Sequence, residues 1–88
     1  MGIVETPGHK KIKQYCLDAA KELGLEVDGD DVSWAEDIIT KEHILTIEAT
    51  TGISEITFLQ QEIEDYVTGV GVDEVHNKIR ESLQAIRA

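Results

Sequence analysis

The sequence contains a single cysteine, Cys16, and therefore has no partner for an internal disulfide. It also lacks an apolar run long enough for a signal peptide or a membrane-spanning helix. A free cysteine and the lack of a targeting segment are typical of proteins in a reducing compartment. We therefore expect a cytoplasmic protein that does not bind membranes.

Basic residues are scarce as well. Eight lysines and arginines oppose 18 aspartates and glutamates, for a net charge of −10, and residues 22–74 hold 15 of the acids but only one base, Lys41. The two ends of the chain carry more bases than acids. Such an acidic surface repels nucleic acid and attracts basic proteins. We expect no direct nucleic-acid binding and a basic protein surface as the partner.

The length of 88 residues and a hydrophobic content of 41% fit one globular domain, residues 1–88. We expect residues 1–5 to form a flexible N-terminal segment. From there, Thr6 is a suitable N-cap and Pro7 a suitable first residue for a helix that ends near Leu23, before Gly24.

Alternation of apolar and polar residues predicts three short strands. The apolar members of the three sets are Val32, Trp34 and Ile38; Leu45, Ile47 and Ala49; and Ile56 and Phe58. Residues 40–42 and 50–52 are expected to form the two tight turns, the second with Gly52 at a positive φ. Connections this short exclude parallel crossovers, so the sheet is an antiparallel meander.

Two further helices follow the strands. Thr57 and Gln60 have the spacing of a capping box, Gly69 ends the second helix, and apolar residues from Val72 to Ile86 mark the third. The order α-β-β-β-α-α predicts an α+β fold, in which helices pack on one face of a three-stranded antiparallel meander sheet.

The other sheet face is then expected to be acidic and rich in hydroxyl groups. Its predicted members are Asp31, Ser33, Asp37, Ile39, Ile44, Thr46, Glu48, Thr50, Ile53, Glu55 and Thr57. Solvent exposure alone accounts for such a face, and so does binding to a partner.

Metal binding is not supported by the residue spacing. A calcium loop aligned on Asp28 and Asp30 fails where Val32, Ser33 and Ile39 stand at its fifth, sixth and twelfth positions. Cys16 and the three histidines, His9, His43 and His76, are too widely spaced for a zinc motif. We expect surface or edge positions for the histidines, and no metal or other cofactor.

Catalytic residues are not indicated either. The carboxylates fall on loops and on the open face, where solvation keeps their pKa values ordinary. Cys16 lies on the apolar face of its helix, where an inert buried thiol is the common case. An enzyme or small-ligand site around Glu62 and Tyr66 remains as a third hypothesis, although a small core leaves little room for a cavity.

The leading hypothesis is a small, non-enzymatic protein-interaction module. The candidate binding residues are Asp28, Asp30, Asp31, Trp34, Asp37, Glu48 and Glu55. They would engage a basic surface of a partner protein, with Trp34 or the isoleucines as apolar anchors. One version is a nucleic-acid mimic, whose carboxylates imitate phosphates to inhibit a nucleic-acid-binding protein. The alternative is a self-associating, homodimeric structural or regulatory domain, since the ends and the middle of the chain have complementary charge.

Overall fold

A computed structural model describes residues 5–87 of the chain. The elements are α1 (Pro7–Glu22), the short 3-10 helix η1 (Gly29–Asp31), β1 (Val32–Glu36), β2 (His43–Ala49), β3 (Gly52–Phe58), α2 (Gln60–Thr68) and α3 (Val72–Ile86). The strands form one antiparallel sheet in the order β1-β2-β3. The predicted α+β fold is therefore confirmed. Four of the five residues predicted to be flexible, residues 1–4, lie outside the described residues.

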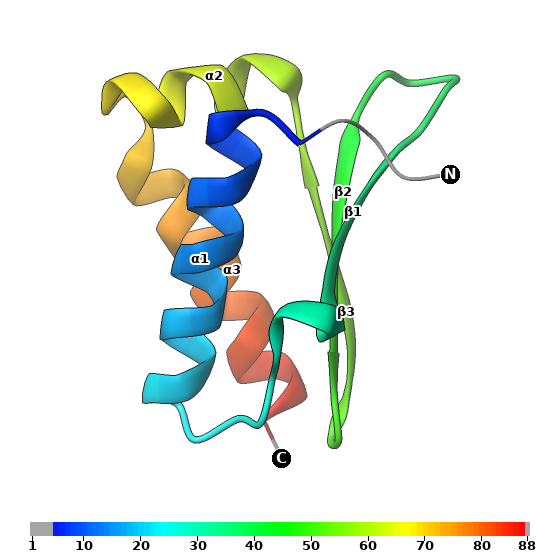
Figure 1. Ribbon diagram of the computed structural model, residues 1–88, viewed down its shortest axis with the longest axis vertical. Helices are drawn as coiled ribbons and strands as arrows, with labels where there is room; N and C mark the ends of the chain where they lie inside the picture. The colour runs from blue at the N-terminus through cyan, green and yellow to red at the C-terminus, as the bar shows by residue number, and fades with distance from the viewer. Residues whose placement is uncertain (1–4, 88) are drawn as a thin grey trace.

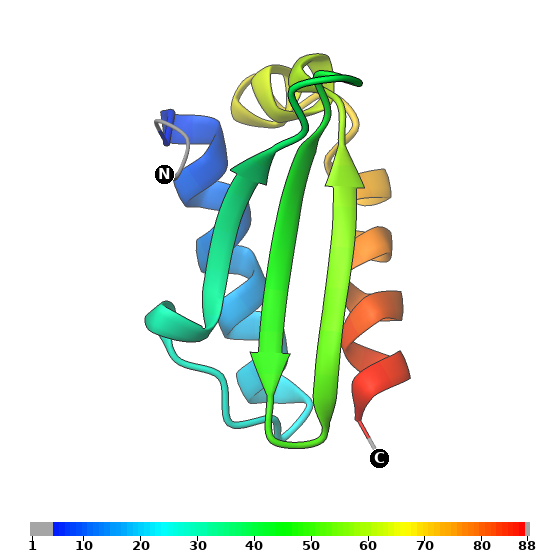
Figure 2. The ribbon, with the colours of Figure 1, turned by 90° about the vertical axis from the view of Figure 1, so that its right-hand side faces the viewer.

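The molecule has two layers. All three helices cover the same face of the sheet, with α1 behind β1 and α3 behind β3, while the opposite face has no helix over it (Figures 1 and 2). At one end of the molecule, α2 and the start of α1 lie near the β1–β2 connection. At the other end lie the β2–β3 turn and the end of α3 (Figure 1).

The ends of α1 follow the predicted caps. Thr6 is the N-cap and Pro7 the first helical residue. After the helix, Gly24 has a φ of 78°, and the amide of Leu25 donates to the carbonyl of Ala20 at 2.9 Å. This pattern is a Schellman motif, which satisfies carbonyls that the helix leaves unpaired.

The two strand connections differ from the prediction. β1 ends at Glu36, which pairs with His43, so Ile38 belongs to the turn rather than to the strand. Ala49 pairs with Gly52, so the second connection has two residues, and Gly52 lies inside β3 without a positive φ. The strand pattern failed at Ile38 because an apolar residue at the right spacing does not need to be paired.

The N-terminal cap of α2 also differs from the prediction. Thr57 is still in β3, and the backbone amide of Leu59 donates to the Glu62 carboxylate at 3.0 Å, so the predicted Thr57–Gln60 capping box does not form. Gly69 ends the helix as predicted, with a φ of 90°. Two left-handed glycines, Gly69 and Gly71, turn the chain from α2 into α3.

One apolar core fills the space between the layers. It consists of Ile12, Cys16, Ala19, Ala20, Val32, Trp34, Leu45, Ile47, Ile56, Phe58, Ile63, Val75, Ile79 and Leu83. Cys16 is fully buried, and burial raises the pKa of its thiol to about 12, as suits an inert thiol. Within residues 5–87, every helix is too short or too polar to cross a bilayer.

Candidate functional site

The open sheet face is less acidic than the sequence predicted. The strand registers place Ser33, Ala35, Ile44, Thr46, Glu48, Ile53, Glu55 and Thr57 on it. Asp31 lies in η1, and Asp37, Ile39 and Thr50 lie in the turns, so these four were assigned to the face wrongly. Only Glu48 and Glu55 carry charge there. Two carboxylates do not form the continuous row that a nucleic-acid mimic needs.

The other candidate binding residues are scattered. Asp28, Asp30 and Asp31 lie in and before η1, where the Asp31 carboxylate accepts from the Asp28 amide at 3.0 Å. Trp34 is only 6% exposed and faces the helices, so it cannot serve as an anchor for a partner. The remaining candidate, Asp37, begins the β1–β2 turn.

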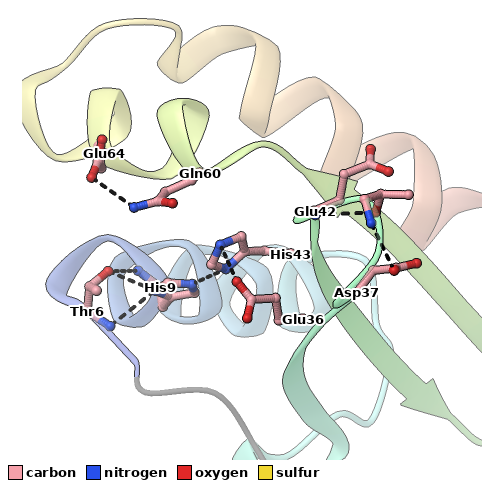
Figure 3. Close-up of polar contacts among 9 residues, drawn as sticks. Thr6, His9, Glu36, Asp37, Glu42, His43, Gln60 and Glu64 are labelled. Carbon is pink, nitrogen blue, oxygen red and sulfur yellow. Dashed lines mark hydrogen bonds and ion pairs between the residues drawn. The ribbon is translucent and has the colours of Figure 1, made fainter.

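That turn gathers apolar and acidic groups at the surface. We call residues 37–42 the hairpin tip. Its Ile38 and Ile39 are 79% and 92% exposed, more than any other large apolar side chain of the described residues. Glu36, Asp37 and Glu42 stand at its base (Figure 3). Burying one isoleucine stabilises a fold by about 1.5–3 kcal/mol, and this protein gains little of that from either isoleucine of the tip.

Hydrogen bonds hold the hairpin tip in one conformation. The Asp37 carboxylate accepts from the amides of Ile39 and Thr40 at 2.9 and 3.1 Å. The Asp37 amide donates to the Glu42 carbonyl at 2.9 Å, and the Lys41 amide donates to the Asp37 carbonyl at 2.8 Å. The amides of Thr40 and Ile39 hold the pKa of the Asp37 carboxyl below its ordinary value, so it stays ionised at neutral pH.

Beneath the base of the hairpin tip lies a buried pair of histidines. His9 from α1 and His43 from β2 are 3% and 7% exposed, so the expectation of surface or edge positions was wrong for both. His9 Nε2 lies 2.8 Å from His43 Nδ1. On the far side of His9, Nδ1 is 3.1 Å from the Thr6 amide and 2.7 Å from its hydroxyl (Figure 3).

The other contacts of the pair are also defined. The Trp34 indole donates to the His9 carbonyl at 3.1 Å and packs edge-on against the His9 ring, with centroids 4.7 Å apart. His43 Nε2 is buried without a hydrogen-bond partner among the described residues, and the nearest Glu36 oxygen is 3.8 Å away. Burial and then the neighbouring His43 lower the pKa of His9, while Glu5 opposes them.

Two sequence signals could have found this pair. Thr6-x-x-His9 has the spacing of a capping box, with the imidazole in the place of the usual glutamate or glutamine. His43 precedes Leu45 and Ile47 by two-residue steps, so the alternation that buries them also buries His43. Treating the histidines as separate ligands hid both patterns, since 34 residues separate them in the chain.

The third histidine has different surroundings. The rings of His76 and Tyr15 stack at 3.6 Å, and the Tyr66 hydroxyl lies 2.8 Å from His76 Nε2. His76 is half-buried within the helix layer, where burial lowers its pKa, Asp73 raises it and Arg80 lowers it. Tyr66, from the third hypothesis, is thus engaged by a neighbouring side chain.

Glu62, the other residue of that hypothesis, is ion-paired with Lys78 at 2.9 Å. Burial alone would raise the pKa of Glu62, but the Leu59 amide and Lys78 bring it below its ordinary value. A carboxyl group whose pKa is lowered is a poor general acid at neutral pH. Among residues 5–87, no three histidine, cysteine, aspartate or glutamate side chains come together in a way that could hold a metal ion.

No protein-family model, no curated protein sequence and no solved structure matches this chain.

Proposed function

We propose that the protein is a non-enzymatic interaction module that binds a basic protein surface through its hairpin tip. The observation that carries this proposal is the exposure of Ile38 and Ile39, 79% and 92%, on a turn with three carboxylates at its base. Exposed apolar side chains of this size favour burial by a partner. The charge distribution then selects which kind of partner approaches.

The partner that fits has an apolar pocket bordered by lysines or arginines. Its pocket would cover the two isoleucines, while its basic groups would face Glu36, Asp37 and Glu42. The hydrogen bonds of the tip support this proposal, because a turn that is already ordered loses little conformational entropy on binding. The lone, buried Cys16 fits a reducing compartment and supports a cytoplasmic setting for the proposed interaction.

A peptide made only of lysine and leucine, with its leucines on one helical face, provides a partner of this chemistry. We expect its addition to shift the backbone amide signals of residues 36–42 in nuclear magnetic resonance spectra. Ile39→Ser should weaken binding by about tenfold or more, because burying one isoleucine is worth about 1.5–3 kcal/mol. The matched control is Ile53→Ser, because Ile53 is also an exposed isoleucine, 65%, but lies on the open sheet face.

A second peptide with serine in place of every leucine keeps the charge and removes the apolar groups. If both peptides bind equally well, the exposed isoleucines do not contribute to binding. If Ile39→Ser binds the leucine peptide as well as the control Ile53→Ser and the unchanged protein do, the tip is not the binding site. Raising the salt concentration should weaken binding of the leucine peptide, because the carboxylates attract it over a distance.

A second candidate function is homodimerisation through the open sheet face. The observation in its favour is Ile53, which projects from that face, is 65% exposed and lies opposite Glu48 of β2. Sedimentation equilibrium over a range of concentrations tests this candidate. A dimer that Ile53→Asp dissociates and Ile39→Asp leaves intact would support the sheet face; a monomer throughout would refute it.

A further inference from the structure

The hydrogen bonds of the histidine pair determine where its protons lie. The Thr6 amide can only donate, so His9 Nδ1 accepts and carries no proton in the neutral state. The proton of neutral His9 is then on Nε2, which donates to His43 Nδ1. The proton of neutral His43 is therefore on Nε2, directed toward the side of Glu36.

One further proton has a single place to go. The hydrogen bond between the rings holds one proton, and His43 Nε2 already carries another, so the added proton lies on His9 Nδ1 whichever ring bears the formal charge. There it faces the Thr6 amide, 3.1 Å away, as one donor against another. The Thr6 hydroxyl, at 2.7 Å, can accept this proton, but the amide loses its acceptor.

A second added proton would place two donors between the rings and two positive charges in a buried site. This is far less favourable than the first addition. The pair therefore takes up one proton per chain, at the expense of one hydrogen bond in the cap of α1.

Some charged groups around the pair favour the uptake of this proton, and one opposes it. Glu5 precedes α1, and Glu36 ends β1 with its side chain 42% exposed; both carboxylates attract the added charge. From α2 come Gln60 and Glu64, which are hydrogen-bonded to each other at 3.3 Å (Figure 3). From α3, the Lys78 ammonium lies over Phe58, the cross-strand neighbour of His43, and opposes the charge.

The pair is connected directly to the hairpin tip. His43 and Glu36 are cross-strand partners, and they flank the hairpin tip on either side. The Glu36 carboxylate lies 3.8 Å from His43 Nε2 (Figure 3). At this distance a positive charge on the pair would attract the carboxylate and offset part of the negative charge at the base of the tip.

We propose that the His9–His43 pair is a binding site for a single proton, and that its occupation weakens the hold of the hairpin tip on a basic partner. The second half of this inference rests on the proposed function, whereas the first half does not. By linkage, a bound basic partner would in turn make the proton leave more readily.

The first experiment needs no partner. We would follow both imidazoles, the Thr6 amide and the amides of residues 37–42 by nuclear magnetic resonance from pH 7.5 to pH 5, above the ordinary range of carboxylate titration. We expect one transition with an uptake of one proton per chain by the pair, and burial keeps the pKa of His9 below that of a free histidine. The fluorescence of the only tryptophan, Trp34, should change with the same midpoint, because it contacts His9.

Three variants make this titration specific. His9→Gln keeps an N–H donor toward His43 but cannot titrate, and His43→Asn keeps an acceptor toward His9 in case the first variant fails to fold. Both should abolish the shared transition. The control His76→Gln, from the helix layer, should leave it unchanged. Independent midpoints for His9 and His43, or a Thr6 amide that does not respond, would overturn the one-proton site.

The second experiment repeats the lysine–leucine peptide titration at pH 7.5 and at pH 5. We expect affinity to fall by about threefold or more in acid for the unchanged protein, and to change less in His9→Gln. Equal acid dependence in both proteins would overturn the coupling. A peptide that does not bind at pH 7.5 would instead refute the proposed function, while the partner-free titration would still decide on the proton site.

Discussion

The two turns of the sheet differ in how they relate to the rest of the fold. The β2–β3 turn uses two threonines, and the Thr51 hydroxyl donates to the Ile86 carbonyl at the end of α3, which ties that end of the molecule together. The β1–β2 turn spans six residues, orders itself through Asp37, and leaves two isoleucines in solvent. The first turn completes the fold. The second has apolar groups that the fold does not use.

The same contrast holds for what lies near each turn. Gly52 lies beside the β2–β3 turn. A Cβ added there would lie 3.4 Å from the Ile86 side chain, which is an ordinary contact distance. Near the hairpin tip, α1 and α2 approach so closely at Gly8 that only glycine fits, and two histidines are buried. Packing at the end of the molecule that carries the hairpin tip is thus tighter than at the β2–β3 turn, although the tip exposes two isoleucines.

The largest expected effect tests this contrast in packing. A Cβ at Gly8 would lie 2.5 Å from the carbonyl oxygen of Ile63 and 2.7 Å from its side chain. Gly8→Ala should therefore lower the free energy of unfolding by about 2 kcal/mol, despite the better helix propensity of alanine. Urea denaturation followed by circular dichroism measures this. The control Gly52→Ala should change stability by less than about 0.5 kcal/mol, and equal losses in both variants would remove the contrast.

The architecture was predictable because its signals are local. The N-cap at Thr6, the glycine stops at Gly24 and Gly69, and the alternation through Leu45 and Ile47 each depend on a few neighbouring residues. The short connections then left one simple topology. No long-range information was needed to place the helices on one face.

The candidate site was less predictable because it depends on contacts across the chain. Asp37 and Ile39 were assigned to the sheet, since alternation alone does not show where pairing stops. His9 and His43 meet only after β2 packs against the start of α1, and a buried imidazole looks like a surface one in sequence. Trp34 lies on the apolar side of its strand, as the alternation predicts, yet its burial removes it as a binding anchor.

The second prediction concerns pH and compares the histidine pair with His76. The folded protein lowers the pKa of His9, so the unfolded chain binds more protons once the pH falls below about 6.5. This part of the stability is therefore fully present above that pH and is lost as the pH falls toward the folded value. Urea midpoints between pH 8 and pH 5 should show the decline.

Variants separate the two sites in that experiment. His9→Gln should flatten the decline more than His76→Gln, because His9 is 3% exposed while His76 is only half-buried. His76 also contributes, since burial lowers its pKa in the same direction. If His76→Gln removes the larger part of the acid-induced loss of stability, then His76 in the helix layer, rather than the histidine pair, controls the response to acid.

The smallest expected effect is local to the turns. Asp37→Ala removes the acceptor of the Ile39 and Thr40 amides, so these two amides should exchange with solvent about fivefold faster while the core amides keep their rates. Thr51→Ala, the matched change in the other turn, should leave residues 39 and 40 as they were and loosen the end of α3 instead. Hydrogen exchange measured by nuclear magnetic resonance resolves both regions in one sample. Because Asp37 orders only the tip, its loss should also weaken binding of the lysine–leucine peptide without lowering global stability. If Asp37→Ala lowers the free energy of unfolding of the whole domain, the hairpin tip, like the other turn, contributes to the stability of the fold.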